Sequence, residues 1–448
     1  MAAYDASLWG AGKMRRSHSI EKAWVHTINA VATSNMGVAN SSRRRVWQFR
    51  AGLMAICLLS PAGLRAQETP KGNFEEVGLN FDLRHFGNSV RSSEASAAAR
   101  GLVLADQRLT VGVDIAVNRD IGRNTLRLVA NVGYDFYRRN TRLNRERIGI
   151  GAETGINVGP CLAEVAARVD RRQSDLDSIA LVNLPDEDSV SNTETVQTYR
   201  VEGRCGYVYG LRPSLGYVHA RGDNSNALRD ISDYTSNRVF GGIAYDHPVI
   251  GKAKLTYEHE KLKFGNRVAT PLAAYSGYQT DEVRLQLSRD IGTLLTADAM
   301  LAYTWLKPDN AAAQDFKGTT WRVGGTIKPG TRLQIRAFTE RSIQPSLGAE
   351  ALYSKQLMNE VRASYALSER LSASGGFSLR KRDYEGAQAN FGPLLDEDKF
   401  RRIFAAMTLR TSRRLDLTLE GGHERRNATG TIFDYSGGYV GLRGRLKL

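Results

Sequence analysis

Apolar and polar side chains alternate along segments of roughly 10 to 14 residues, and these segments recur from about Gly78 to the last residue. In one of them the apolar residues are Leu109, Val111, Val113, Ile115 and Val117, and the polar residues between them include Thr110, Asp114 and Asn118. Because successive side chains of a β-strand point to opposite faces, each such segment has one apolar and one polar face. No helical pattern separates the copies. This repeated alternation is typical of a closed β-barrel in an outer membrane.

The length and hydropathy of the chain agree with this interpretation. A chain of 448 residues would suggest about three soluble domains, but one barrel of many strands accommodates the same length. The mean hydropathy is −0.37, and beyond the N-terminal region no stretch approaches the roughly 20 apolar residues that a membrane helix needs. These values exclude a helical membrane protein and allow a barrel, which needs only every second residue to be apolar.

The N-terminal region has the features of a targeting segment. Arg43, Arg44 and Arg45 precede the apolar run 51–59, and Leu64-Arg65-Ala66 is a candidate cleavage site. We therefore predict that residues 1–66 are an N-terminal extension plus a signal peptide, which is removed. The mature chain then has a periplasmic segment at 67–77 and a transmembrane barrel at 78–448. Because the first 40 or so residues carry no pattern, Met36 is an alternative translation start.

The charge balance bears on the partner. The full chain carries a formal net charge of +15, and removing residues 1–66 leaves 53 basic and 45 acidic residues, a net charge of about +8. The basic residues form no stripe or reading motif of the kind that nucleic-acid binding requires, so we expect no nucleic-acid partner. Distributed over alternate strand positions, they favour a lumen or loop surface that attracts anions.

Alternation and turn residues together predict an all-β fold: a transmembrane antiparallel up-and-down β-barrel of about 18 strands. The strands are expected near 78–86, 108–118, 125–137, 147–158, 161–171, 196–209, 213–221, 236–246, 252–263, 281–289, 294–306, 319–328, 331–341, 358–367, 371–381, 400–410, 414–424 and 435–447. Short turns and longer polar loops alternate between them without exception. Outer-membrane barrels keep short turns in the periplasm and long loops outside, so we expect both termini in the periplasm.

Inward positions, identified by parity, carry many charges. The predicted pore-lining residues are Arg127, Arg168, Arg200, Arg204, Arg284, Arg322, Arg332, Arg336, Arg402, Glu202, Glu258, Asp298 and Glu420. Eighteen strands enclose more space than side chains fill, so the lumen should hold water unless loops plug it. For any one residue two interpretations stay open: it faces the solute, or it pairs with an opposite charge on the next strand. The main candidates for an anion preference are Arg322, Arg332, Arg336 and Arg402.

Two further patterns concern the outer surface of the barrel. Aromatic residues with outward parity fall near strand ends, as in Tyr134 with Phe136 and Tyr303 with Trp305, which suits an interfacial girdle. Cys161 and Cys205 lie on the two strands that flank a hairpin centred near residue 183, so they would lie opposite each other. They form either a cross-strand disulfide or two unpaired small apolar residues facing lipid.

The sequence gives no sign of catalysis. The histidines of the mature chain, His85, His219, His247, His259 and His423, show no metal-ligand spacing, and no serine stands in a nucleophile-elbow sequence. The acidic runs 186–188 and 396–398 lack the spacing of a calcium-binding loop and are more typical of solvated loop tips. We therefore expect no enzyme activity, no metal and no cofactor.

The chain closes on Asp434-Tyr435-Ser-Gly-Gly-Tyr439-Val-Gly-Leu-Arg-Gly-Arg-Leu-Lys-Leu448, after a ladder of arginine-rich alternating strands. Together with the signal peptide, these features resemble the β-barrel porin 2 family of outer-membrane proteins, whose genes often accompany exopolysaccharide synthesis and export. The resemblance implies a polysaccharide-conducting porin that works beside a periplasmic polysaccharide-export protein.

The expected function is passive passage of a polar solute, with export of an acidic or neutral exopolysaccharide as the main interpretation. One alternative is a general diffusion or nutrient-uptake porin with the same fold. A second is a plugged barrel with a structural or enzymatic role. The expected partners are outer-membrane lipid and lipopolysaccharide, the barrel assembly machinery and the periplasmic export protein.

Overall fold

The computed structural model of the chain describes residues 72–173, 192–206, 209–249, 251–266, 276–309, 315–345, 353–385, 396–430 and 433–448. The signal peptide and extension predicted for 1–66 lie outside these residues. The strands are β1 (Phe74–Phe86), β2 (Asp106–Ile121), β3 (Asn124–Tyr137), β4 (Arg145–Val158), β5 (Cys161–Gln173), β6 (Thr193–Cys205), β7 (Gly210–Asn224), β8 (Tyr234–His247), β9 (Gly251–Phe264), β10 (Gly277–Ile291), β11 (Leu295–Pro308), β12 (Phe316–Ile327), β13 (Leu333–Pro345), β14 (Tyr353–Ala366), β15 (Leu371–Glu385), β16 (Glu397–Arg410), β17 (Leu415–Ala428) and β18 (Tyr435–Lys447).

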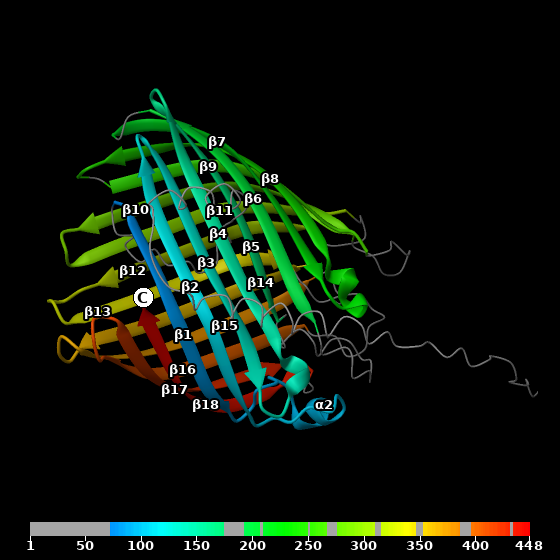
Figure 1. Cartoon of the computed structure of the whole chain (residues 1–448). Helices are drawn as coiled ribbons and strands as arrows, with labels where there is room; N and C mark the ends of the chain where they lie inside the picture. Colours follow the sequence, from blue (N-terminus) through cyan, green and yellow to red (C-terminus); the bar gives the residue numbers. More distant parts are fainter. Residues whose placement is uncertain are drawn as a thin grey trace, which may run out of the picture. The chain divides into compact units, whose positions relative to one another are not determined.

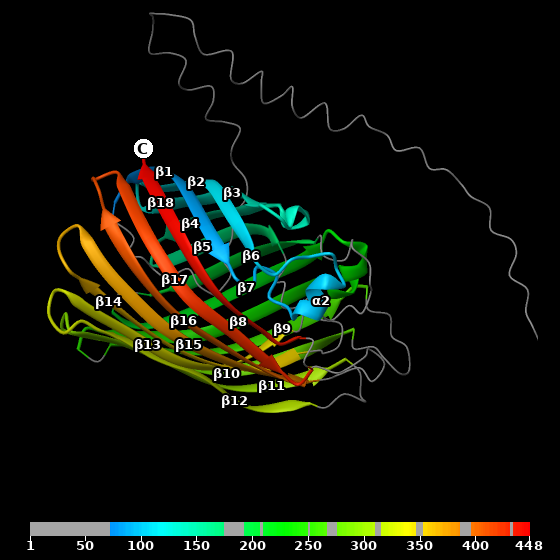
Figure 2. The same cartoon turned by 90° about the horizontal axis from the view of Figure 1, so that it is seen from below.

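These strands form one closed antiparallel barrel of 18 strands (Figure 1). Every strand pairs with its neighbours in the sequence, and β1 also pairs with β18, from Gly78 opposite Lys447 to Phe86 opposite Tyr439. Figure 2 shows β1 and β18 side by side where the ring closes. Closure gives every strand two paired neighbours, which a sheet needs in order to stand in lipid, and the shortest pairing joins Trp321–Ile327 of β12 to Ile335–Arg341 of β13. The predicted fold class is confirmed.

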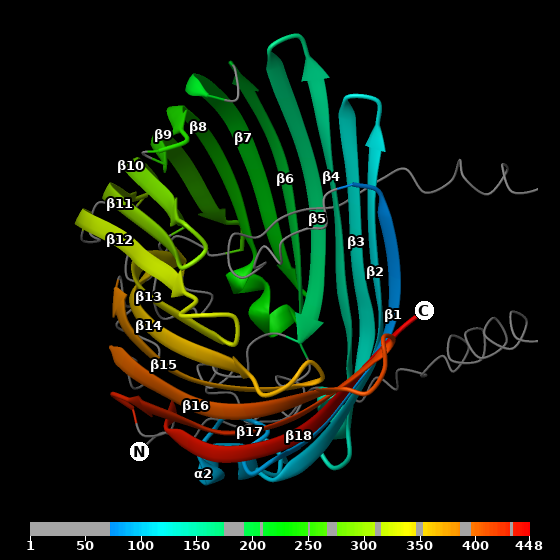
Figure 3. The same ribbon diagram turned by 90° about the vertical axis from the view of Figure 1, so that its left-hand side faces the viewer.

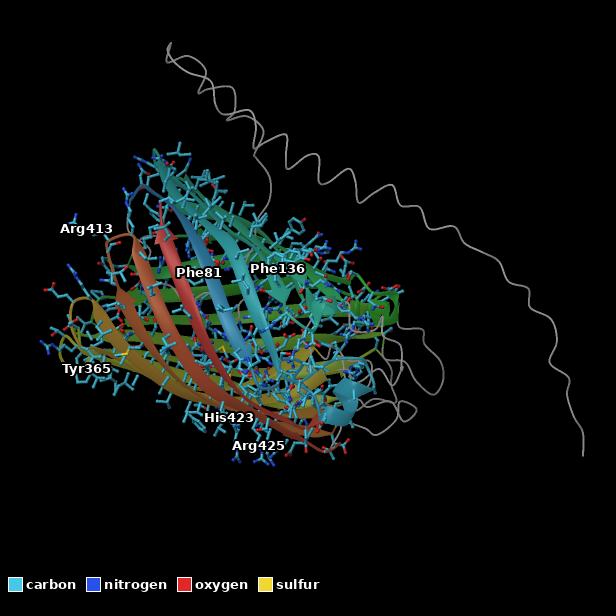
Figure 4. All side chains as sticks on the ribbon, turned by 60° about the horizontal axis from the view of Figure 1, so that its bottom comes forward. Phe81, Phe136, Tyr365, Arg413, His423 and Arg425 are labelled. Atoms are coloured by element: carbon cyan, nitrogen blue, oxygen red, sulfur yellow. A yellow bond between two sulfur atoms is a disulfide. The ribbon has the colours of Figure 1, made fainter. Side chains whose placement is uncertain are left out.

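The outer face of the barrel is apolar. On β1 the outward side chains Leu79, Phe81 and Leu83 are 37 to 47% exposed, while inner-wall residues such as Glu202 and Thr304 are buried. Figure 4 shows Phe81 on β1 and Phe136 on β3 pointing away from the barrel. A soluble protein buries its large apolar side chains, so this reversed distribution fits a wall whose outside faces acyl chains.

The strands extend a few residues beyond the predicted ends, mostly toward the long loops. β14 begins at Tyr353 rather than near 358, and β10 begins at Gly277 rather than near 281. The alternation of apolar and polar residues reveals only the part of a strand that faces lipid. Backbone hydrogen bonding between strands continues beyond that part, into the polar sequence next to the long loops. At the other end β1 begins at Phe74, which lies opposite Asn118, so the barrel includes the last residues of the predicted segment 67–77.

Short connections lie at one end of the barrel, the end that faces the viewer in Figure 3, and because the strands are antiparallel the longer connections join them at the other end. Gly122, Gly159 and Gly292 occupy three of the short turns with φ of 64°, 59° and 57°, a left-handed conformation that favours glycine. The backbone N–H of Leu448 donates to Val77 at 2.9 Å, so the C-terminus lies at the short-turn end.

The first long connection, residues 87–105, is a compact lobe that contains the helix α2 (Glu94–Ala98). It packs with the short 3-10 helix η1 (Thr141–Leu143) around Leu143, which is fully buried. Asp106 holds the two segments together by accepting the backbone N–H of Asn140 at 2.8 Å. A second 3-10 helix, η4 (Ala227–Ser232), precedes β8. None of the helices that the structure describes is long and apolar enough to cross a membrane.

Candidate solute path through the barrel

Strand parity places almost all predicted pore-lining residues on the inner face. Arg127, Arg168, Arg200, Arg204, Arg284, Arg322, Arg336, Arg402, Glu202, Glu258, Asp298 and Glu420 alternate there with outward apolar neighbours. Arg332 is the exception, and its placement on a strand was wrong. β13 begins at Leu333, so Arg332 lies exposed in the short turn that follows Pro329 and Gly330.

Most of the inner arginines lie within ion-pair distance of a carboxylate. The pairs are Arg168 with Asp170, Arg200 with Glu202, Arg204 with Glu164, Arg284 with Glu258 at 3.0 Å, Arg322 with Glu340 at 3.3 Å, and Arg402 with Glu420 at 3.2 Å. For these residues the structure favours the second interpretation, in which charges on the wall neutralise one another. Such pairs make the wall polar without giving it a strong net sign.

Aromatic rings on the same wall hold several guanidinium groups in place. Arg402 donates to the Tyr439 hydroxyl at 2.8 Å, and its guanidinium carbon lies 5.3 Å from the centre of the Phe404 ring. Arg362 approaches that same ring at 5.3 Å, and Arg322 lies 4.9 Å from the Phe338 ring. A cation over an aromatic face is attracted by the ring quadrupole, so these arginines are positioned rather than free to collapse onto the wall.

One pair of inner arginines is not neutralised in this way. Arg336 on β13 lies directly opposite Arg362 on β14. Within the described ranges, neither guanidinium has a carboxylate within the 4.0 Å of an ion pair. Opposed side chains on neighbouring strands have Cβ atoms about 5 Å apart, so two positive charges meet on one patch of the lumen wall. This is the part of the wall best suited to attract an anion.

A cavity of about 820 Å³ lies along the inner wall from β6 to β13. Its lining includes Glu202, Arg238, Glu258, Arg284 and Arg322. At about 30 Å³ for each water molecule, it has room for more than twenty of them. Charged side chains and this volume together indicate a hydrated space rather than a packed core.

A tightly buried charge cluster closes part of the wall near the long-loop end. Asp398 on β16 accepts from Arg382 at 2.6 Å and from Arg426 at 2.7 Å, and the Tyr384 hydroxyl donates to it at 3.0 Å. Asp398 and Arg426 are almost fully buried. Nearby, Arg91 of the first long connection lies 3.2 Å from Glu424 on the inner face of β17, so this lobe reaches into the mouth of the barrel.

The cysteines lie away from this path. A disulfide joins Cys161 at the start of β5 to Cys205 at the end of β6, and the two residues are register partners. Their parity is that of the exposed Val165 and Val201, so the bond is on the outer face at the short-turn end. It braces neighbouring strands and contributes nothing to the lumen.

The outward aromatic pairs predicted from the sequence lie in contact. The Tyr134 and Phe136 rings are 4.6 Å apart between centroids, and the Tyr303 and Trp305 rings are 4.7 Å apart. Both pairs lie toward the long-loop end. Tyr365, labelled in Figure 4, lies at the short-turn end of β14. Aromatic side chains therefore border the apolar band at both ends, where headgroups meet acyl chains.

The residues considered for chemistry are dispersed. All five histidines have outward parity on different strands, and His259 contacts Asp281 at 2.9 Å. In the described part of the chain no group of three or more His, Cys, Asp or Glu could hold a metal ion. The acidic run 186–188 lies outside the described residues. The run 396–398 is divided by strand parity, with Glu397 bound to lysines outside and Asp398 bound to arginines inside.

Arg362, Phe404 and Tyr439 are residues that the sequence reasoning did not place in the lumen. A signal for Arg362 existed, because the short turn near 368–370 fixes the β14–β15 hairpin and the parity of β14 follows from it. The closeness of Arg362 to Arg336 depends on the register between β13 and β14, which hydropathy does not encode.

No family model matches the chain, and no curated protein matches it. Outer-membrane proteins of Pseudomonas are among the solved structures to which the chain is similar. OccK2 (OpdF) from Pseudomonas aeruginosa, solved in complex with glucuronate, is 11% identical with a TM-score of 0.46, over 84% of this chain and 100% of that chain. OpdK from the same organism, solved with vanillate, is 13% identical with a TM-score of 0.46, over 84% and 99%. A BenF-like porin from Pseudomonas fluorescens Pf-5 is 14% identical with a TM-score of 0.47, over 84% and 99%.

Proposed function

We propose that the protein is an outer-membrane channel through which small polar solutes cross passively, with a preference for anions. The observation that carries the proposal is the barrel wall itself, which is closed, apolar outside and charged inside, with a hydrated cavity along it. A wall of this kind separates lipid from water. Barrels of about 18 strands are wide enough to leave an aqueous channel inside.

The inner wall supports weak and exchangeable binding of solutes. Paired charges such as Arg284 with Glu258 offer donors and acceptors without a strong trap, while the opposed Arg336 and Arg362 supply a local positive potential. Conduction requires binding that favours entry and yet permits departure. The anion preference therefore rests on the inner arginines that have no ion pair among the described residues, which are this opposed pair together with Arg127 and Arg145, rather than on every arginine of the lumen.

The orientation follows from the connections. We infer that the short turns and both termini face the periplasm and that the long loops, with the lobe 87–105, face outside. The assembly machinery of the outer membrane is then the partner that inserts the barrel, and lipopolysaccharide surrounds its outer half.

Passage of small solutes is favoured over polysaccharide export. The export interpretation rested on the family resemblance, and no family model matches the chain. A diffusion or uptake channel, by contrast, needs only the geometry described above. A periplasmic export partner has no docking segment among the described residues, whose short-turn end carries only tight turns.

Liposome swelling tests this proposal. Liposomes containing the purified full chain are transferred into isosmotic galactose, galacturonate or a large dextran. We expect both monosaccharides to enter, galacturonate faster than galactose, and dextran to be excluded. Swelling no faster than in protein-free liposomes would contradict the channel. Entry of dextran would instead restore polymer export as the main interpretation.

A further inference from the structure

The outer face of β16 and β17 changes character toward the long loops. Ile403, Met407 and Leu419 are exposed apolar side chains of the lipid-facing band. The next outward position on β16 is Arg401, and on β17 Gly421 is followed by His423 and Arg425. Figure 4 shows His423 and Arg425 pointing away from the barrel, far along β17 from Arg413 in the short turn. We refer to Arg401, His423 and Arg425 as the outer arginine patch.

The two arginines of the outer arginine patch are register partners. Arg401 lies directly opposite Arg425, and Ile403 lies opposite His423. The Arg425 Nε donates to Asn427 at 2.9 Å, and the His423 ring contacts the Ser436 hydroxyl at 3.0 Å. Neither contact supplies a negative charge. Across the described residues no carboxylate forms an ion pair with Arg401 or Arg425, although opposed like charges destabilise a strand pair.

Several other outward cations at this end of the barrel pair with carboxylates, although others within the described residues form no ion pair, namely Lys261, Lys263, Lys307, Lys317 and Arg341. Arg171 on β5 lies 2.7 Å from Glu146 on β4, and Arg221 lies 2.8 Å from Asp223 on β7. Close to the patch, Lys381 on β15 contacts both Asp383 and Glu397. The outer arginine patch differs from these cations because two arginines without a carboxylate lie directly opposite each other in it.

The position of the patch indicates what could compensate it. It borders the apolar band directly, so its guanidinium groups lie at the level of lipid headgroups while their alkyl stems remain against apolar surface. Guanidinium groups bind phosphate with two parallel hydrogen bonds, and a pair of them surrounds a phosphate better than a single cation does. Near a membrane surface each basic residue attracts anionic lipid appreciably.

We propose that the outer arginine patch is a binding site for the phosphate of an anionic lipid in the leaflet at the long-loop end, where the outer membrane carries phosphorylated lipopolysaccharide. The proposal rests on the orientation inferred above, and it assigns this sector of the outer wall a fixed lipid. Arg401 and Arg425 bind the phosphate, and His423 adds a third donor at the border of the apolar band.

Lipid retention by the purified full chain tests the site. The wild type, R401Q/R425Q and the control R413Q/R414Q are incubated in detergent with lipid A, with its dephosphorylated form or with inorganic phosphate. Arg413 and Arg414 are exposed in the short turn between β16 and β17, so the control removes the same charge at the opposite end. Bound lipid is then counted by native mass spectrometry, and folding is checked by heat-modifiable migration.

We expect the wild type and the control to retain lipid A equally and R401Q/R425Q to retain about fivefold less for each arginine removed. Dephosphorylated lipid should be retained poorly by all three proteins. Equal retention by R401Q/R425Q, or retention that does not need the phosphate, would overturn the site. Displacement of lipid A by millimolar inorganic phosphate would also overturn it, since a free anion would then suffice. If the double variant does not fold, R401Q and R425Q alone carry the same comparison.

The channel is tested separately from this site. R401Q/R425Q should swell liposomes at the wild-type rate, because its substitutions face lipid. A wild type that binds lipid A but admits no solute would refute the channel and leave the lipid site standing. A wild type that conducts but binds lipid A no better than R401Q/R425Q would refute the lipid site and leave the channel standing.

Discussion

Two pairs of arginines face each other across neighbouring strands, one on each side of the same barrel wall. Arg336 and Arg362 meet on the inner face of β13 and β14, and Arg401 and Arg425 meet on the outer face of β16 and β17. The strand register imposes the same close approach in both places. The surroundings differ, because the inner pair faces water with mobile anions and the outer pair faces fixed headgroups. One local arrangement thus serves two different partners.

In a third place, a carboxylate of the protein itself neutralises two neighbouring arginines. Arg382 and Arg426 converge on Asp398, and the carboxylate lies within 2.7 Å of both. That cluster is nearly sealed from solvent, with Arg426 only 1% exposed. A buried arginine requires a counter-charge from the protein itself. The two opposed pairs remain accessible, so a solute or a lipid can supply their counter-charge. Four substitutions test this distinction.

Asp398→Ala should have the largest effect, because it leaves buried arginines without their counter-charge. We expect the free energy of unfolding in detergent to fall by about 3 to 5 kcal/mol. Denaturant titration followed by tryptophan fluorescence measures it. The matched control is Asp416→Ala. Asp416 lies 3.6 Å from Arg410, whose side chain is well exposed, so this substitution should lower the free energy of unfolding by less than about 1 kcal/mol. Equal losses in the two variants would remove the distinction between buried and accessible arginines.

R336E/R362E should alter ion selectivity more than any outward substitution. It changes the charge of one lumen patch by four units, so we expect anion preference to become cation preference, a change of about tenfold or more in permeability ratio. Reversal potentials in a salt gradient give the ratio. R401E/R425E carries the same charge change on the outer face and should leave the ratio unaltered. A shift of similar size in both variants would show that the two pairs are not on opposite sides of the wall.

Glu340→Gln should have a smaller effect of opposite sign. The substitution releases Arg322, which lies 3.3 Å from Glu340, and so adds one uncompensated positive charge to the lumen. We expect the anion preference to rise by about twofold in the same assay. An unchanged or reduced preference would mean that paired and unpaired arginines contribute alike.

Arg425→Gln in lipid-free detergent should have the smallest effect. It relieves repulsion with Arg401 and removes only a hydrogen bond to Asn427, so the free energy of unfolding should change by no more than about 0.5 kcal/mol. A loss of 2 kcal/mol or more in the denaturant titration would reveal a structural contact of Arg425 within the barrel and argue against a role in lipid binding.

The barrel could be predicted from the sequence because alternation reports directly on which residues face lipid. Leu109, Val111 and Ile115 are outward as expected, and the order of short and long connections fixes the topology. Strand ends could not be predicted as well. Tyr353 starts β14 in polar sequence, where hydrogen bonding continues although the apolar face has ended.

The inner wall was predictable only in part. Parity places Arg322 and Arg336 inside, but it does not reveal that Arg322 faces Glu340 while Arg336 faces Arg362. That difference depends on which residues of two strands lie opposite each other. Arg332 shows a second limit, because a turn two residues longer than expected removes it from the strand. Parity therefore identifies the wall, and register decides which charges on it are free.

As a channel, the barrel must hold a continuous aqueous path along a wall with free positive charge. Single-channel recording of the purified full chain in planar bilayers, under a potassium chloride gradient, measures both properties. We expect discrete open-channel steps with a reversal potential on the chloride side, and loss of that chloride preference in R336E/R362E. An absence of conductance above the bare bilayer, or a cation preference in the wild type, would contradict the account.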